Sequence, residues 1–520
     1  MKNKYFPYAV GLLLFAVAFI AGMLTYKDYG ITWDELDQRL IGNLTYDYVT
    51  TGKKDLLTYI YRFYGTGFEL PLAMFERWFH LTEIRDIYYM RHLVTHSLFL
   101  LSALSLYILS FRLTRSVVIA SLCFLMLLFA PRIYAHSFFN TKDIPFLCMF
   151  LITMSFSQLA FSRNKAGLYL ALGMLAGYTT SIRVMGIMLF GFIGLFMLLD
   201  LWAEKKRSGD LRKQYINIGL YGLGFCVALY VAWPYLWRNP IGNFIESYQV
   251  MSHYDWDASV LIGGAYEHTT ELPWTYFPTW FVITTPLLWT LTGAAGLVLI
   301  VADFVKKPRL FLANGRERNY LLFLLCFLIP VLAVIKLNAV IYDDWRHLYF
   351  VYPSFVLAGM YFINKVFVNK YKYAVAGLGA LQLALAGMFM VKNHPFQQVY
   401  FSDLVNHEEE YLRENYELDY WGASFKEGLQ YLATHDSSSN IKIACNYEDP
   451  VQHNIIMLNP ADRKRFEFVK TVDKADYFIT NFRGHKEDYP SKNVAYNIMV
   501  LNSSIMRIYK IKNTTATNQQ

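Results

Sequence analysis

Long apolar runs recur along this chain of 520 residues, and they restrict its fold more than any other feature. Eleven nearly uncharged runs of 16 to 23 residues are separated from one another by polar segments. A helix needs about 20 consecutive apolar residues to cross a membrane. The runs therefore predict about eleven transmembrane helices, near residues 7–26, 93–111, 115–131, 144–161, 166–181, 184–201, 215–233, 280–302, 320–335, 347–363 and 373–391.

Composition supports a chain that lies mostly in lipid. Hydrophobic residues make up 55% of it and charged residues 17%, whereas soluble domains contain about 25% charged residues. These values exclude a soluble multidomain protein and a disordered chain. The net charge of +8 does not indicate a nucleic-acid partner, because most Lys and Arg residues lie in short segments between apolar runs. The five cysteines form no zinc-binding pattern, and four lie within apolar runs, so no disulfide framework is expected.

The positions of Lys and Arg orient the predicted helices. With the N-terminus inside, the short cytoplasmic segments carry 19 of these residues and the short outer segments carry 6, in agreement with the positive-inside rule. The same count favours two spans with a tight turn at Arg183 over one long helix across 166–201. Segments 27–89 and 234–279, and everything after residue 392, then face outward. The sequence thus predicts a multi-pass protein of the inner (cell) membrane with a cytoplasmic N-terminus.

Two domains are expected, and together they define the fold class as a polytopic α-helical membrane protein with a small α/β C-terminal domain. Residues 1–394 form the transmembrane domain, and residues 395–520 have the composition of a soluble domain on the outer face. Residues 424–434 have helical spacing. Strands are indicated at 441–445 and 476–480 and in two apolar runs near the C-terminus.

Four polar motifs follow apolar runs, and the predicted topology brings all four to the outer face. They contain Asp34-Glu35, the stretch 131–145 with His136, Lys142 and Asp143, the turn at Arg183, and Asp343-Asp344-Trp345-Arg346-His347. Charges at helix ends often serve only as interface anchors or as caps. Arg183 fits that interpretation poorly, because a charge held close to membrane depth usually has a functional partner.

Carboxylates and cations together beside lipid suit the transfer of a sugar from a lipid phosphate. A carboxylate removes a proton from the acceptor hydroxyl, which then attacks the anomeric carbon. Cations or a metal ion stabilise the lipid phosphate that leaves. A channel or a transporter would also place charges along its pathway, so the residues alone leave a transporter or flippase of a lipid-linked or anionic solute as an alternative.

At these motifs the sequence resembles the GT-C superfamily of polytopic glycosyltransferases. It is most similar to bacterial members of glycosyltransferase family 39, the protein-O-mannosyltransferase and aminoarabinose-transferase-like class. The resemblance rests on the stretch 131–145, on Ser181-Ile182-Arg183-Val184-Met185-Gly186, on Trp345-Arg346-His347-Leu348-Tyr349-Phe350 and on Asp419-Tyr420-Trp421-Gly422. It covers about residues 1–420 and implies an enzyme, a glycosyltransferase that uses polyprenyl-phosphate sugars and inverts the anomeric carbon.

The resemblance also implies roles for individual residues. Asp34 matches the general base, with Glu35 beside it, and Asp143 matches a second carboxylate that positions the acceptor or a metal. The cations suited to the donor phosphate are Lys142, Arg183 and Arg346, and the groups suited to sugar or phosphate contacts are His136 and His347. No cofactor is certain, although a divalent ion such as Mg²⁺ or Mn²⁺ is possible.

The partners expected are the polyprenyl-phosphate sugar donor, the lipid bilayer, and a glycan, lipid or protein acceptor. The tail 395–520 differs from the extra domain of eukaryotic protein mannosyltransferases, so lipid A, another glycolipid, a polysaccharide and a protein remain open as acceptors. The Trp-rich and Tyr-rich segment 234–279 suits either sugar faces or the lipid interface. A non-catalytic scaffold whose tail binds a partner is a third hypothesis.

Overall fold

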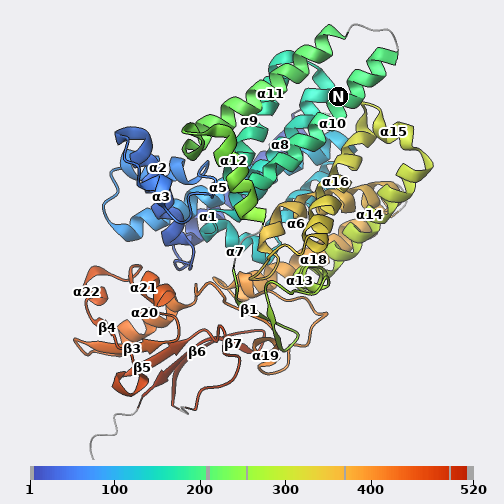
Figure 1. The fold of residues 1–520 in the computed structure, drawn as a ribbon. Coiled ribbons are helices and arrows are strands. Elements are labelled where there is room, and N and C mark those ends of the chain that lie inside the picture. The colour runs from blue at the N-terminus through green and yellow to red at the C-terminus, as the bar shows by residue number, and fades with distance from the viewer. Residues whose placement is uncertain (1–4, 207–210, 253–255, 368–370, 491–492, 512–520) are drawn as a thin grey trace, which may run out of the picture.

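A computed structural model describes residues 5–206, 211–252, 256–367, 371–490 and 493–511 of the chain. A bundle of long helices makes up most of the molecule, and a twisted sheet with short helices lies against one end of it (Figure 1). The N-terminal helix begins at the opposite end of the bundle, near α15 (Pro308–Leu312). The predicted fold class, a polytopic helical protein with a small C-terminal α/β region, is confirmed.

The chain is a multi-pass membrane protein, because eight of the helices in its described part are long and apolar enough to cross a membrane. A ninth span results if α6 (Val117–Leu128) and α7 (Pro131–Phe139) are counted together, although they meet at an angle of 62°. The eight are α1 (Phe6–Thr25), α5 (Ile84–Thr114), α8 (Asp143–Arg163), η1 with α10 (Val184–Gly186 and Ile187–Lys206), α11 (Arg212–Ala232), α14 (Leu287–Lys306), α16 (Arg316–Lys336) and α18 (Lys372–Lys392).

Two of the eleven predicted spans correspond to helices that are too short to count as membrane-crossing helices. Helix α9 (Ala166–Ile182) has 17 residues, and α17 (Tyr352–Phe362) has 11 and follows the 3-10 turn η3 (Arg346–Val351). Every residue from Tyr352 to Met360 is buried. The apolar sequence of α17 therefore reflects burial inside the protein rather than contact with lipid. Hydropathy alone cannot distinguish a short buried helix from a membrane span. A short π-helix, η4 (Ile363–Phe367), follows α17.

Glycines bring two helices of the bundle into close contact. Gly173 and Gly177 lie four residues apart on α9 and face α11. A Cβ atom added at Gly173 would lie 2.1 Å from the Tyr221 carbonyl oxygen, and one at Gly224 would lie 2.3 Å from the Leu170 carbonyl oxygen. Small residues in this spacing allow helix backbones to approach inside a membrane. Helix α9 packs against α11 in this way and ends at Ile182. The extended backbone of Arg183 then separates α9 from η1 and α10. The predicted turn at Arg183 is thus confirmed.

The two predicted outer segments contain regular structure that the sequence did not predict. Segment 27–89 folds into α2 (Glu35–Thr51), α3 (Asp55–Thr58) and α4 (Glu69–Trp78). The buried guanidinium of Arg91 in α5 pairs with Glu69 and Glu76, which fixes α4 against the bundle. Segment 234–279 contains η2 (Pro234–Trp237), α12 (Pro240–Ser252), the start of α13 (Tyr276–Thr284), and a hairpin of β1 (Ser259–Ile262) and β2 (Ala265–His268).

The hairpin turn requires glycine. Gly263 and Gly264 have φ angles of 58° and 81°. Two consecutive positive φ angles give the turn whose twist matches that of antiparallel strands. The hairpin contacts the C-terminal region through an isolated β-bridge between Ile262 and Tyr416.

The C-terminal region is built on a five-stranded mixed sheet with strand order β4-β3-β5-β7-β6. Strands β4 (Phe466–Phe468), β3 (Ile441–Cys445) and β5 (Tyr477–Thr480) are parallel, and β7 (Ser503–Lys510) and β6 (Val494–Val500) complete it in antiparallel fashion. The predicted helix at 424–434 is confirmed as α20 (Phe425–His435), and strands occur at the four predicted places. The remaining elements are η5 (Gln397–Val399), α19 (Tyr411–Asn415), α21 (Glu448–Ile455), α22 (Pro460–Arg463) and η6 (Val472–Lys474).

Candidate functional site

Two adjoining cavities lie where the helix bundle meets the C-terminal region. The larger has a volume of about 580 Å³ and polar walls, and the smaller has a volume of about 240 Å³ and mostly apolar walls. Tyr64, Lys142 and Tyr342 line both cavities, so the two adjoin at these side chains. The predicted motifs meet around this junction.

Aromatic rings and carboxylates dominate the polar cavity. Its aromatic side chains are Trp33, Tyr61, Tyr64, Trp256, Tyr266, Tyr342, Trp421 and Tyr447. Its charged side chains are Asp34, Asp37, Asp343, Glu417, Lys142 and Arg483. Aromatic walls with a few placed polar groups are typical of small-molecule sites. The cavity contains both acceptors for a proton and cations for an anion.

Asp34 lies at the wall of the polar cavity on a tightly held loop. It is the N-cap residue of α2, and its side chain is 34% exposed. Asn454 of α21 bonds to both the backbone N–H and the carbonyl of Ile31, and the Trp33 N–H donates to the Trp421 carbonyl oxygen at 3.1 Å. The C-terminal region therefore fixes the loop that carries Asp34. One carboxylate oxygen of Asp34 lies 3.7 Å from the Arg346 guanidinium.

Glu35 is turned away from both cavities. Its carboxylate accepts hydrogen bonds from the backbone N–H and the hydroxyl of Thr32, at 2.8 and 3.1 Å, and its other oxygen lies 3.0 Å from Nε2 of His92. This arrangement closes the first turn of α2 as a capping box does. The structure therefore does not bring Glu35 together with Asp34 at the cavity, although the two are adjacent in sequence.

A continuous series of ion pairs joins the C-terminal region to the membrane helices. Arg483 contacts one oxygen of Asp343 at 3.0 Å, and Arg346 contacts the other at 3.3 Å. Arg346 also lies 3.3 Å from Asp143, whose second oxygen pairs with Arg183. The alternating charges arise from four separate parts of the chain. Such buried groups persist only when each has its partner.

Asp143 and Arg346 are the centre of this series and line neither cavity. Both side chains are 2% exposed. Asn140 donates a further hydrogen bond to Asp143 at 2.9 Å, and Arg346 packs over the rings of Trp421 and Tyr342. Their contacts leave little room for substrate, so the structure assigns them to positioning the residues around them.

The cations that reach the junction are Lys142 and Arg183. Lys142 Nζ lies 3.3 Å from the centre of the Tyr64 ring, and Arg183 is 14% exposed at the wall of the apolar cavity. Burial, reinforced by the charge of Arg183, lowers the pKa of Lys142 to about 7. His347 lines the same apolar cavity with its ring against Tyr342. Three of the predicted phosphate or sugar contacts therefore lie together.

His136 belongs to a separate buried network. Its ring nitrogens contact Asn140 and the Tyr420 hydroxyl, each at 3.1 Å. The Tyr420 hydroxyl donates to Asp344, which also pairs with Arg132 at 3.0 Å. Burial raises the pKa of the Asp344 carboxyl. The network connects α7 to the C-terminal region behind the cavity, and the structure does not place His136 where it can reach a ligand there.

Besides Asp37 of α2, sequence reasoning missed two charged residues of the polar cavity, Arg483 and Glu417. Both come from the C-terminal region, and neither stands in a motif that distinguishes it from a surface charge. Burial, opposed by the charge of Arg483, raises the pKa of Glu417 to about 7. A second missed signal is conformational: Asp343 and Asp344 have φ angles of 55° and 62°. Strained backbone of this kind is concentrated at functional sites.

The carboxylates do not form a ready-made metal site. Within the described residues, no group of three or more His, Cys, Asp or Glu side chains is placed to hold a metal ion. Arginines already contact Asp143 and Asp343. These donors therefore do not fit a resident ion, and the divalent ion stays a prediction of the resemblance.

One family model matches part of the chain. It is described as dolichyl-phosphate-mannose-protein mannosyltransferase and matches residues 68–239, about a third of the sequence. The matched range contains Lys142, Asp143 and Arg183 but neither Asp34 nor Arg346. Over this range the match confirms the resemblance predicted from the motifs. No curated protein sequence matches the chain.

Solved structures of similar shape share little sequence with the chain. The apo oligosaccharyltransferase of Archaeoglobus fulgidus has 11% identity and a TM-score of 0.47, over 91% of this chain and 65% of that one. The same organism's enzyme AglB in complex with an inhibitory peptide and a dolichol-phosphate has 11% identity and a TM-score of 0.49, over 92% and 70%. ArnT from Cupriavidus metallidurans bound to undecaprenyl phosphate has 10% identity and a TM-score of 0.45, over the whole of both chains. The chain thus spans about two thirds of the archaeal apo enzyme.

Proposed function

We propose that the protein transfers a sugar from a polyprenyl-phosphate donor to an acceptor hydroxyl at the outer face of the membrane. The observation that carries the proposal is the junction of the two cavities, where cations separate apolar walls from a carboxylate-containing and aromatic chamber. A lipid-linked sugar has three parts in the matching order: an apolar chain for the apolar cavity, an anionic phosphate for the cations and a polar ring for the polar cavity. The partial match to a mannosyltransferase family supports the same donor class.

The donor lies across the junction in this proposal. The first prenyl units occupy the apolar cavity, whose walls come from η1, α10, α12 and the end of α16. The phosphate lies between Lys142 and Arg183, since charge-assisted hydrogen bonds to phosphate are strong in a partly dry site. The sugar then projects into the polar cavity, where flat rings and carboxylates can contact its faces and hydroxyls.

Asp34 is the general base of the proposed reaction. The acceptor hydroxyl gives its proton to the Asp34 carboxylate, and the oxygen forms a bond to the anomeric carbon. The bond between that carbon and the phosphate oxygen breaks, and both its electrons leave with the lipid phosphate. A single displacement of this kind inverts the anomeric carbon. Lys142 and Arg183 stabilise the charge that develops on the leaving phosphate.

The arrangement of the chain divides the work between two domains. Residues 1–394 supply Asp34, Lys142 and Arg183, and the region 395–520 completes the polar cavity with Arg483 and Glu417. We place this end of the molecule outside the inner membrane, on the basis of the Lys and Arg distribution. A glycan, a lipid and a protein all present suitable hydroxyl groups as acceptors.

Donor turnover by purified protein tests the proposal. The protein is incubated in lipid nanodiscs with a panel of polyprenyl-phosphate monosaccharides and an extract of envelope glycolipids, glycans and proteins. Release of polyprenyl phosphate and gain of one sugar mass on an acceptor are followed by mass spectrometry. We expect one donor to be consumed by the wild type and not by Asp34→Asn. In a parallel experiment with the protein in sealed proteoliposomes, movement of intact donor across the membrane with no covalent transfer, in wild type and variant alike, would establish a flippase instead.

A further inference from the structure

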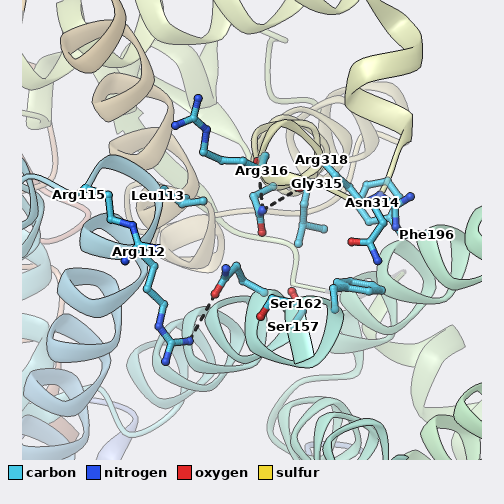
Figure 2. Close-up of a pocket in the computed structure, with 14 residues that line it drawn as sticks. Arg112, Leu113, Arg115, Ser157, Ser162, Phe196, Asn314, Gly315, Arg316 and Arg318 are labelled. Carbon is cyan, nitrogen blue, oxygen red and sulfur yellow. Dashed lines mark hydrogen bonds between the residues drawn. The ribbon is translucent and has the colours of Figure 1, made fainter. Parts of the chain in front are cut away.

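A second large pocket lies at the other end of the helix bundle from the candidate site. Its volume is about 570 Å³, and Figure 2 shows its lining residues around an open centre. The walls come from the last turns of α5 and α8, from α10 and from the loop that leads into α16. Helix α16 extends from this pocket, at Arg316, to the apolar cavity, which it lines at Pro330 and Ala333. The two sites therefore lie a membrane-spanning helix apart.

Among the described residues, arginine is the only charged residue type in the wall of this pocket. Arg112, Arg115, Arg316 and Arg318 line it, and no Asp or Glu of the described part of the chain does. Arg318 is buried and is held by both oxygens of Asp200 at 2.7 and 2.8 Å, so its charge is balanced. The other three are half-buried or exposed and surround the opening (Figure 2).

These three arginines are poorly neutralised by the protein. Within the described residues, the Arg112 guanidinium forms one hydrogen bond, to the amide oxygen of Gln158 at 3.4 Å. Across the described residues, neither Arg112 nor Arg115 has a carboxylate within ion-pair distance, whereas Arg316 lies 3.6 Å from the adjacent Glu317. Guanidinium groups in the wall of one pocket repel one another, and an anion bound in the pocket relieves that repulsion.

Further donors face the same space. The N-terminus of α16 begins at Gly315, and no side chain caps it. Its free N–H groups and the positive end of its dipole favour an anion. The amide of Asn314 is also in the wall. The hydroxyl groups of Ser157 and Ser162 line it too but donate to the backbone carbonyl oxygens of Met154 and Leu159.

We propose that this pocket binds the phosphate group of an anionic ligand at the cytoplasmic membrane surface. Guanidinium groups pair with phosphate oxygens in a two-pronged geometry, which Arg112, Arg115 and Arg316 can supply. Basic pockets between the cytoplasmic ends of membrane helices bind phospholipid headgroups. An inner-leaflet phospholipid and a soluble phosphate compound share this chemistry, and the experiment separates them. The inference does not depend on the proposed glycosyl transfer.

The test measures ligand binding to three forms of the full-length protein. The pocket variant is Arg112→Gln/Arg115→Gln/Arg316→Gln, which leaves the buried Arg318–Asp200 pair intact. The matched control is Lys205→Gln/Lys307→Gln/Arg309→Gln, which removes the same charge from exposed positions at the same end but outside the pocket. Delipidated protein in neutral detergent is titrated with phosphatidylglycerol, cardiolipin or phosphatidylcholine and analysed by native mass spectrometry. A parallel arm follows thermal stabilisation by inorganic phosphate and pyrophosphate.

We expect the wild type and the control to bind one anionic ligand with affinities within about twofold of each other, since isolated surface charges contribute little. The pocket variant should bind at least about tenfold more weakly, because it loses three charge-assisted contacts. Preference for the two anionic lipids identifies a headgroup, and stabilisation by phosphate salts without lipid preference identifies a soluble ligand. The Arg→Lys triple variant, which keeps the charge and the fold, should bind with intermediate affinity. Equal weakening in pocket variant and control, or none in either, would overturn the proposal.

Discussion

Replacing Asp34 by asparagine tests the proposed general base, because the structure predicts a large kinetic effect and a small effect on folding. Asparagine has nearly the same shape and is also favoured at a helix N-cap. The lost charge lies 3.7 Å from Arg346 on a side chain that is 34% exposed, and such pairs contribute about 0–1 kcal/mol to stability. Arg346 keeps its contacts with Asp143 and Asp343, each at 3.3 Å.

The expected kinetic effect is that of a missing general base. A positioned base contributes about 10²–10⁴-fold to a rate, which corresponds to about 2.7–5.5 kcal/mol of activation free energy. The initial rate of polyprenyl-phosphate release at saturating donor measures this loss, and a thermal melt of the same sample measures folding. We expect a rate at least about 100-fold lower and a melting temperature close to that of the wild type.

The control is Asp47→Asn, which makes the same chemical change on the same helix. The Asp47 side chain is 37% exposed and, among the described residues, is ion-paired with Lys53 alone, at 3.4 Å, so its replacement should leave the rate unchanged. The reasoning is refuted if Asp34→Asn keeps more than about a tenth of the wild-type rate, since a lost base is expected to cost more. Asp37→Asn and Glu417→Gln would then show whether another carboxylate of the cavity accepts the proton.

Four further predictions concern different parts of the molecule. Lys142 must be protonated to bind phosphate and its pKa is lowered to about 7, so the donor KM should rise as the pH increases above about 7, whereas Lys142→Arg, which stays charged, should remove this rise. Arg483→Met should lower kcat/KM at least about tenfold by disordering the C-terminal wall of the cavity, and Arg483→Lys should recover part of it in the same rate assay. Glu35→Ala should lower the free energy of unfolding by about 1–3 kcal/mol, because it strips partners from buried groups, while the folded protein keeps its kcat. Gly173→Ala should destabilise the protein by about 1–3 kcal/mol through overpacking of α9 against α11, which a thermal melt in detergent would detect.

Much of the fold follows from patterns that extend over many residues. Apolar runs located the helices, and the Lys and Arg count favoured the break at Arg183, which the structure has. Hydropathy failed at α17, whose apolar run is covered by protein on all sides. It also gave no indication of α12 or of the β1–β2 hairpin, because short elements packed on a surface have neither the length nor the periodicity that such reasoning uses.

The candidate site was less predictable than the fold. Motifs grouped Asp34, Lys142 and Arg183, and the structure brings these around the two cavities. The same motifs grouped Glu35 with Asp34, although successive residues at a helix start point in different directions. Arg483 lies at least 300 residues after each of these three residues in the sequence. No local sequence pattern can predict a contact between such distant segments.

The ion-pair series explains why function is best tested at the cavity walls rather than at its most buried charges. Removing Arg346 would leave Asp143 and Asp343 each with only one cationic partner, in surroundings that are 2–3% exposed. A buried charge with no partner at all costs about 3–5 kcal/mol, so even part of that cost at both carboxylates is a substantial share of the roughly 5–15 kcal/mol by which proteins are typically stable. An inactive Arg346 variant would therefore not separate a role in catalysis from a role in assembly. Asp34 and Lys142 face the cavities and can be changed with the series intact, so a loss of rate there reports on the chemistry itself.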